Sequence, residues 1–466
     1  FENTATRILV LELQEGSKVS ICSSYSDYEE GYAVAGKIND MRMQNYDYAD
    51  FAILYRTNAQ SRILEEALRK KGIPYKIYGG LSFYQRKEVK DVISYLRLIV
   101  NPHDEEAFKR VINYPARGIG DTTLNKLVVA ATDHNVSLWT VLNDPIGYAL
   151  PVNNGTAKKL SDFRELISGF IERNVKLSAE EIAAAVVKES GIVSTLFQDR
   201  SVEGISKQEN LQELLKGIAE FCEIRREEGT EHVSLADFLS EVSLLTDQDN
   251  DKEEQANKVT MMTVHAAKGL EFRNVFVVGL EEDLFPSAMS KDNPRAVEEE
   301  RRLFYVAITR AEENCVLTHA RSRYRNGQST MCSPSRFLKD IDPKYIYTSA
   351  DAVTTNGLLA TRRSSVFQQP KAMEGEAYVS PVAQAVGRQA RLTRMETASL
   401  SSAPSSSSAP ALSGLHVGAK VRHDRFGEGE VTAIEGEGGN AKATVSFAHF
   451  GQKQLLLKFA RLTIVE

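Results

Sequence analysis

Thr263-Val-His-Ala-Ala-Lys-Gly-Leu-Glu-Phe272 and Glu299-Glu-Arg-Arg-Leu-Phe-Tyr-Val-Ala-Ile-Thr-Arg-Ala311 are the stretches that decide the fold. The first overlaps a β-branched and apolar run, Val259 to Val264, which predicts a buried strand. A second apolar run, Asn274 to Leu280, predicts another strand after the loop that holds Lys268. A strand followed by a polar loop is where an α/β sheet usually presents its ligands.

A helix is expected between these strands and a further strand, Cys315 to Thr318. Carboxylates at 298–300 favour a helix N-terminus, and the helix is expected to end near Thr309 and Arg310. An arginine at a helix end can direct its planar guanidinium group outward at a phosphate.

The N-terminal part alternates strands with helices, which predicts a parallel sheet with helices on both faces. The expected strands are Val19–Ser24, Phe51–Tyr55 and Tyr75–Tyr78, and the expected helices are Asp27–Met43, Ser61–Lys71 and Phe83–Arg97.

The pattern changes after residue 101, and helical periodicity dominates until an acidic loop at Asp247–Glu254. Because sheet motifs lie on both sides, this block predicts an all-helical domain inserted into an α/β domain. The expected helices are Glu105–Ile112, Thr122–Asp133, Lys158–Glu172, Ala179–Ser190, Lys207–Glu227 and Leu235–Leu245.

The C-terminal part begins with a low-complexity stretch, Ser401 to Pro410, which is expected to be a flexible tether. Short alternating runs separated by glycines then predict a small β-barrel. Its expected strands are Lys420–His423, Gly429–Glu435, Ala441–Phe447 and Gln454–Leu457.

Three stretches resemble motifs of the UvrD/PcrA/Rep group of superfamily 1A DNA helicases. Thr263–Phe272 is similar to motif V, Glu299–Ala311 to motif VI, and Phe51–Arg62 to motif IV. His423–Gly429 resembles the Tudor-like barrel that closes many PcrA-type chains, whose motif order this chain follows most closely. The resemblance covers nearly the whole chain.

The resemblance divides the chain into five expected parts. They are 1–100, the first part of the second RecA-like domain; 101–256, the helical insertion; 257–348, the second part of the RecA-like domain; 349–414, a disordered Ser/Pro-rich linker; and 415–466, the Tudor-like barrel.

For ATP, the resemblance implies that Arg56 and Arg310 reach the γ-phosphate, where a fixed positive charge assists phosphoryl transfer. It also implies that Tyr55 stacks on adenine and that Glu271 accepts hydrogen bonds from the ribose. The structural alternatives are surface ion pairs for the arginines, a core aromatic for Tyr55 and a solvated carboxylate for Glu271.

For single-stranded DNA, the resemblance implies contacts from His265 and Lys268. Helical spacing places Arg86, Lys87 and Lys90 on one side beside Tyr84, which suits a phosphate track with base stacking. The alternatives are a capping or packed histidine and a solvated basic face.

For duplex DNA, the expected contact is the turn Pro115-Ala-Arg-Gly-Ile-Gly-Asp121 with Thr122 just after it. Gly118 and Gly120 would let main-chain N–H groups approach a phosphate at a helix N-terminus. An ordinary turn between two helices has a similar sequence.

No Gly-x-x-x-x-Gly-Lys-[Ser/Thr] loop and no Asp-Glu pair after an apolar strand is found. Gly31–Lys37 matches only seven positions, with Ile38 in place of the hydroxyl and within an expected helix, so it is rejected. The family carries both motifs on its first motor half. The chain is therefore expected to need that N-terminal half for ATP hydrolysis, with the Mg²⁺ ligands there.

Composition agrees with a soluble, cytoplasmic protein. The net charge of −6 excludes a uniformly basic coat but not a local DNA track. The four cysteines, Cys22, Cys222, Cys315 and Cys332, form no metal or disulfide pattern, and no apolar run is long enough to span a bilayer.

The expected function is that of an ATP-dependent 3′–5′ DNA helicase of repair and replication, to which this chain contributes the C-terminal motor half. The alternative is a non-catalytic module that binds DNA, or RNA polymerase through the tail barrel. A scaffold role leaves the arginine motifs without a purpose.

Overall fold

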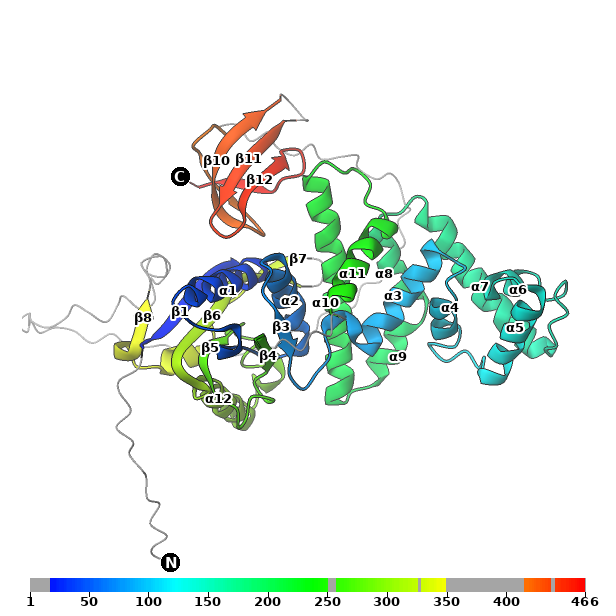
Figure 1. The fold of residues 1–466 in the computed structure, drawn as a ribbon, viewed down its shortest axis with the longest axis horizontal. Coiled ribbons are helices and arrows are strands. Elements are labelled where there is room, and N and C mark those ends of the chain that lie inside the picture. Colours follow the sequence, from blue (N-terminus) through cyan, green and yellow to red (C-terminus); the bar gives the residue numbers. More distant parts are fainter. Residues whose placement is uncertain (1–16, 250–256, 326–327, 349–414, 437–440, 466) are drawn as a thin grey trace, which may run out of the picture.

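The computed structural model describes residues 17–249, 257–325, 328–348, 415–436 and 441–465. Three units are built from them (Figure 1): a sheet domain, a helical insertion, and a C-terminal β-module made of residues 415–436 and 441–465. The expected linker 349–414 and most of the expected acidic loop 247–254 lie outside the described residues.

The sheet domain contains a mixed sheet whose main path is parallel, in the order β3-β4-β2-β5-β6-β1-β8. Antiparallel β7 pairs with the end of β6. The strands are β1 (Val19–Ser26), β2 (Phe51–Tyr55), β3 (Tyr75–Ile77), β4 (Val259–Thr263), β5 (Phe272–Val277), β6 (Ala311–Arg325), β7 (Gln328–Met331) and β8 (Ile346–Thr348). Every residue of β2 is buried, as expected for a central strand covered on both faces. The predicted α/β sheet is confirmed.

Three helices cover the sheet: α1 (Asp27–Arg42), α2 (Ser61–Lys70) and α12 (Pro294–Ile308). Alternate residues of β2 face opposite sides, because side chains alternate along a strand. Phe51 and Ile53 join the core beneath α1 and α2, and Ala52 and Leu54 join the core beneath α12. Figure 1 shows α12 on the opposite side of the sheet from α1. The rejected Gly31–Lys37 match lies inside α1.

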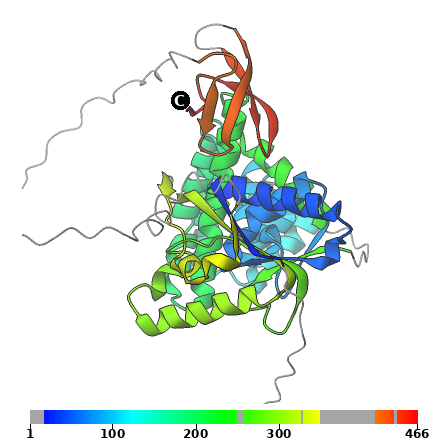
Figure 2. The same ribbon diagram turned by 90° about the vertical axis from the view of Figure 1, so that its left-hand side faces the viewer.

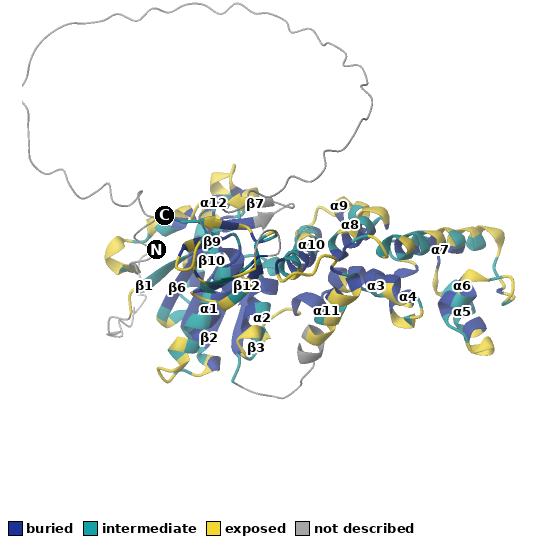
Figure 3. Cartoon of the chain, turned by 90° about the horizontal axis from the view of Figure 1, so that it is seen from above, coloured by how far each residue is buried: buried dark blue, intermediate teal, exposed yellow. Residues whose placement is uncertain are grey.

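The helical insertion has one hydrophobic core that runs from Phe83 to Val242. Its helices are α3 (Lys87–Val100), α4 (Glu105–Val111), α5 (Asp121–His134), α6 (Leu138–Asn143), α7 (Asn154–Asn174), α8 (Ala179–Glu189), α9 (Ile192–Gln198), α10 (Val202–Glu227) and α11 (Leu235–Asp249), after a 3-10 turn, η3 (Phe83–Gln85). Figure 3 shows α3 dark blue along much of its length. Because α3 is buried in this core, the insertion begins packing at Phe83, earlier than the expected boundary at 101.

The C-terminal β-module is a five-stranded antiparallel sheet in the order β12-β11-β10-β9-β13. Its strands are β9 (Lys420–His423), β10 (Gly427–Glu435), β11 (Lys442–Phe447), β12 (Gly451–Leu456) and β13 (Leu462–Ile464). The predicted small C-terminal β-fold is confirmed, with β13 as a strand that the sequence analysis missed. Figures 1 and 2 show the module lying against the side of the molecule that carries α1.

Across the described ranges, no helix combines the length and the apolar character needed to cross a membrane. In the same residues, no group of three or more His, Cys, Asp or Glu side chains is arranged to hold a metal ion.

A buried ionic network ties α1 to the carboxyl side of the sheet. Arg323 of β6 contacts Glu281 at 2.5 Å, Glu30 at 2.7 Å and Asp27 at 3.6 Å. Glu30 also accepts hydrogen bonds from the backbone N–H of Gly279 and from the hydroxyl of Thr318. Burial raises the pKa of Glu30, the Arg323 charge opposes that shift, and the Glu281 charge adds to it. One guanidinium group therefore compensates several buried carboxylates.

We predict that Arg323→Met lowers the free energy of unfolding of the sheet domain by about 3–5 kcal/mol at pH 7, because it leaves buried carboxylates unpaired. The pKa of Glu30 rises further without Arg323, so the loss shrinks as the pH falls and the carboxyl group takes up a proton. Urea unfolding at pH 7 and pH 5 measures both effects.

The matched control is Arg336→Met. Arg336 makes an equally short contact, 2.6 Å, with Glu282, but it lies at the surface with 42% of its side chain exposed. Its loss is expected to cost less than about 1 kcal/mol. Equal losses for the two variants would contradict the role given to Arg323.

Candidate functional site

The motif loops begin at the carboxyl edge of the parallel sheet. Strands β2 and β4 run side by side with Tyr55 opposite Thr263. The N–H of Val264 donates to the carbonyl of Tyr55 at 2.9 Å. Arg56 and His265 follow these paired ends, so strand register alone brings two distant motifs together.

Arg56 is held by a carboxylate of α12. Its Nη2 lies 2.6 Å from Oε1 of Glu300, and its Nε lies 3.0 Å from Oε2. The side chain of Arg56 is 21% exposed and that of Glu300 10%. Two parallel N–H···O bonds give this pair a fixed geometry as well as a strong interaction. The charge of Arg56 is thus already compensated within the protein.

His265 lies beside this pair. Partial burial of the ring lowers the pKa of His265, and the positive charge of Arg56 lowers it further, while Glu300 acts in the opposite direction. The neutral imidazole is therefore favoured, and it can donate a hydrogen bond from one ring nitrogen and accept one at the other. His265 and Lys268 are both exposed on the loop that follows β4.

The same loop ends at the opposite, amino edge of the sheet. Gly269 has φ +90°, a left-handed conformation that turns the chain back toward β5. The N–H of Phe272 then donates to the carbonyl of Arg310 at 2.9 Å, and Phe272 pairs with Ala311. Glu271 is exposed just before this junction.

Arg310 caps the end of α12 with neutral partners. Its Nη1 donates to the carbonyl of Leu270 at 3.0 Å, Nε to the carbonyl of Val306 at 3.1 Å, and Nη2 to the hydroxyl of Thr309 at 3.1 Å. A cation is stabilised at a helix C-terminus. In the part of the chain that the structure describes, no carboxylate forms an ion pair with Arg310, so its charge is available to an anion.

The two arginines lie at different places along α12, Arg56 beside Glu300 in the middle of the helix and Arg310 just after its C-terminal end. Arg56 contacts Glu300, whereas Arg310 contacts Val306, and six residues of helix span about 9 Å. Arg56 follows the carboxyl end of β2, and Arg310 precedes the amino end of β6. The backbones of the two residues that were expected at one γ-phosphate therefore lie at opposite edges of the sheet.

Tyr55, the expected adenine-stacking residue, is buried with 1% exposure at the carboxyl end of β2. Burial raises the pKa of its hydroxyl, and Glu65 adds to the shift. In this structure the ring is a core side chain at the opposite edge from Glu271.

The expected DNA track on the insertion divides into buried and exposed residues. Arg86 is buried and donates to Oδ1 of Asn210 at 2.9 Å and to the hydroxyl of Ser61 at 3.1 Å. Tyr84 is 7% exposed. Lys87 and Lys90 are exposed. Arg86 and Tyr84 thus lie in the junction between insertion and sheet domain, and only the lysines face solvent.

The expected duplex-binding turn precedes α5 as predicted. Gly118 has φ +69°, and its carbonyl accepts from Nζ of Lys159 at 3.2 Å. The amide of Asn113 accepts from the N–H groups of Arg117 at 2.9 Å and Ile119 at 3.1 Å, which fixes the turn. Gly120 is the N-cap of α5, and Thr122 is exposed in its first turn.

The sequence analysis missed two residues that shape the site. Glu300, the partner of Arg56, was read only as part of an acidic helix start, and Asn210, the partner of Arg86, lies in α10 far along the chain. Neither carries a local signal, because the contact depends on tertiary packing.

Comparisons with known proteins agree with this architecture. The model of the UvrD-like helicase C-terminal domain matches residues 2–322, and that of the PcrA/UvrD tudor domain matches residues 417–463. DNA helicase II of Escherichia coli K12 is 35% identical over 451 residues, covering 97% of this chain and 56% of that protein.

Two further relatives are similar to the same extent. The ATP-dependent DNA helicase PcrA of Staphylococcus epidermidis RP62A is 35% identical over 96% of this chain, and that of Staphylococcus aureus NCTC 8325 is 36% identical over 96%. The chain spans about half the length of these curated relatives, 56% in each case. With two thirds of its length matched by the helicase domain model and a C-terminal tudor match, the chain belongs to the UvrD/PcrA family of DNA helicases.

Proposed function

We propose that this chain supplies the C-terminal motor half of an ATP-dependent helicase that moves 3′ to 5′ on single-stranded DNA in repair and replication. The proposal is supported above all by Arg310, an arginine at the end of α12 whose partners among the described residues are all neutral, next to the exposed Glu271. A γ-phosphate could replace the carbonyl partners of this guanidinium group without breaking an ion pair.

The nucleotide and the DNA are assigned to opposite ends of the loop that joins β4 to β5. At the amino edge, Arg310 meets the γ-phosphate and Glu271 the ribose. At the carboxyl edge, His265 and Lys268 meet single-stranded DNA, and Arg56 positions His265 rather than binding phosphate, because Glu300 already neutralises it. Arg56, which was expected at the nucleotide, is thus assigned to the end of the loop that meets DNA.

Arg310 fits a role in which this half of the motor reaches a triphosphate that is held by the phosphate-binding loop of the other half. Arg310 supplies charge to the departing phosphate, and an N-terminal motor half would hold the triphosphate and Mg²⁺. When ATP draws the two halves together, Arg310 moves toward the phosphate, and the connected loop carries His265 and Lys268 along the DNA. Closure and reopening would then advance the strand.

A second candidate is a module that binds duplex DNA without catalysis. The ordered turn at Gly118, the free helix start at Gly120 and the exposed Lys87 and Lys90 favour it. ATPase assays with and without the N-terminal half separate the two candidates. Turnover that requires both halves supports the motor, and DNA binding with no turnover in the joined protein supports the module.

We predict that Arg310→Ala, in the chain joined to its N-terminal half, lowers ATP turnover about 10³-fold or more, because the guanidinium group acts mainly on the transition state. Nucleotide affinity should change little. Steady-state ATPase rates and fluorescent-nucleotide titration measure the two effects.

The matched control for this assay is Arg302→Ala on the same helix, where Arg302 pairs with Glu299 at the surface. Its turnover should stay near that of the unmodified protein. Near-normal turnover in Arg310→Ala would refute the assignment.

We also predict that Arg56→Gln raises the pKa of His265. The substitution removes a positive charge that disfavours the imidazolium ion and leaves Glu300, which favours it, without its partner. Proton NMR titration of the His265 ring follows the shift. Arg56→Lys keeps the charge and should leave the titration near its original position; an unchanged pKa in Arg56→Gln would show that the two groups do not interact.

A further inference from the structure

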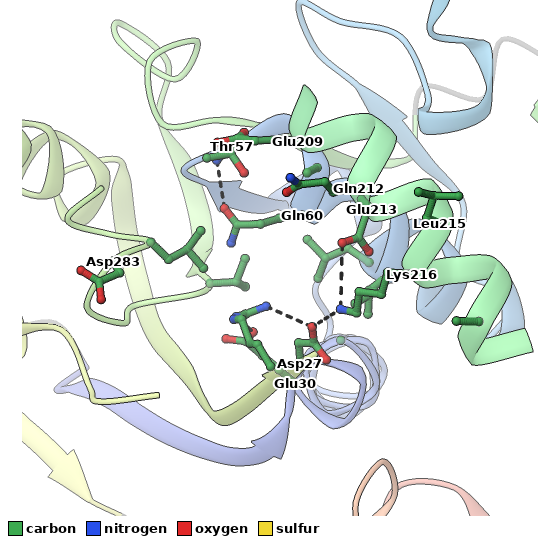
Figure 4. A pocket seen from close by; sticks show the side chains of 18 of the residues that line it. Asp27, Glu30, Thr57, Gln60, Glu209, Gln212, Glu213, Leu215, Lys216 and Asp283 are labelled. Atoms are coloured by element: carbon green, nitrogen blue, oxygen red, sulfur yellow. Dashed lines mark hydrogen bonds and ion pairs between the residues drawn. The ribbon is translucent and has the colours of Figure 1, made fainter. Parts of the chain in front are cut away.

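The junction between sheet domain and helical insertion is polar and loosely filled. Arg62 of α2 contacts Glu213 at 2.7 Å and Glu220 at 2.6 Å on α10, and Lys216 of α10 pairs with Asp27 of α1. Beside these pairs lies a cavity of about 540 Å³ lined by side chains of both units (Figure 4). Polar interfaces between domains of one chain resemble transient ones, and relative motion is their usual behaviour.

The C-terminal β-module contacts both sides of this junction. Toward α10, Arg425 lies 2.6 Å from Glu223, Arg461 lies 3.1 Å from Glu223, and His423 lies 3.0 Å from Glu227. Glu220, Glu223 and Glu227 follow helical spacing, so they share one face of α10. Arg425 and Arg461 of the module relieve the repulsion along this face.

Toward α1, the module contributes aromatic rings. Phe450 stacks on Tyr28 with ring centroids 5.4 Å apart and an interplanar angle of 4°, and it lies 4.5 Å from the ring of Tyr32. Phe426 is 4% exposed and contacts Phe450. The hydroxyl of Ser26 donates to the carbonyl of Arg425 at 2.6 Å.

The contact between His423 and Glu227 is buried, whereas Arg461 lies at the rim. His423 and Glu227 are 2% and 1% exposed, and the apolar core of the sheet domain continues through α1 into the module without interruption. A module that bound elsewhere would leave Glu227 and the tyrosines of α1 uncovered. The module is therefore built to lie at this place on its own chain.

We propose that the C-terminal β-module is an intramolecular clamp that holds the helical insertion against the sheet domain, gripping α1 with Phe426 and Phe450 and α10 with His423, Arg425 and Arg461. The clamp stabilises one orientation of the insertion, and its release lets the junction open. The module cannot offer this face to a partner protein while it is docked.

The test uses the 466-residue chain without nucleotide or DNA, so its result is independent of the proposed helicase activity. Arg425→Glu and Glu223→Arg each place like charges opposite one another, from the two sides of the contact. Because the two substitutions lie in different units, misfolding of one unit cannot be the common cause of a result that both variants share. Lys420→Glu, at an exposed lysine of the same module, is the control with the same charge change as Arg425→Glu.

Two measurements are made on each variant. Small-angle X-ray scattering should show a larger radius of gyration in both reversal variants and an unchanged one in Lys420→Glu. Acetylation of Lys216 by an amine-reactive ester, followed by mass spectrometry, should rise several-fold in the reversal variants, because its side chain is only 9% exposed in the closed junction. Lys109, on the insertion away from the module, is the internal reference.

The outcomes separate clearly. A larger radius together with faster labelling of Lys216 supports the clamp. An unchanged radius in both reversal variants overturns the docking, and a larger radius with unchanged labelling overturns the clamping of the junction.

Discussion

The parallel register of β4, β2, β5 and β6 is the constraint on which the candidate site depends. Strand β5 lies between β2 and β6, so Leu54, Val277 and Leu317 lie level across the sheet. A chain that leaves β4 at its carboxyl edge must return to the amino edge before it can begin β5. The loop between them therefore spans the sheet, and its two ends lie at opposite edges as a direct result of the parallel strand order.

Helix α12 gives the two ends of this loop a common support. Glu300 holds Arg56 near one end, and the carbonyl of Val306 holds Arg310 near the other. An α-helix is stiff over this length, so α12 is a continuous physical connection between Arg310 and the Arg56–Glu300 pair beside His265. The proposed coupling between the nucleotide end and the DNA end of the loop rests on this connection.

Sequence reasoning succeeded where a local pattern determines the structure. The bounds of β2 and β9 were predicted residue for residue, because a fully buried β-run and a short alternating run between turns each have few alternatives. The short helices α6 and α9, of six and seven residues, were missed. A helix over Phe83–Arg97 was also predicted, but the backbone at Arg86 is extended, and its side chain turns inward.

The site was harder to predict for the same reason. Spacing on a helix could not show that Arg86 meets Asn210, a residue 124 positions away. Nor could two separated motifs show that Arg56 follows one edge of the sheet and Arg310 precedes the other, since that is a property of strand order and direction. The residue types in each motif indicated the chemistry, but the sequence did not show how far apart the motifs lie in space.

Several acidic residues of α10 are paired with cations from the other two units. Glu213, Glu220, Glu223 and Glu227 would make α10 a strongly acidic ridge in an isolated insertion. In the folded chain these carboxylates meet Arg62 from the sheet domain and Arg425 and Arg461 from the C-terminal β-module. Part of the net negative charge is therefore used internally rather than displayed to solvent. Because the compensating cations come from segments on both sides of the insertion in sequence, the carboxylates of α10 have all of these partners only when the three units are assembled.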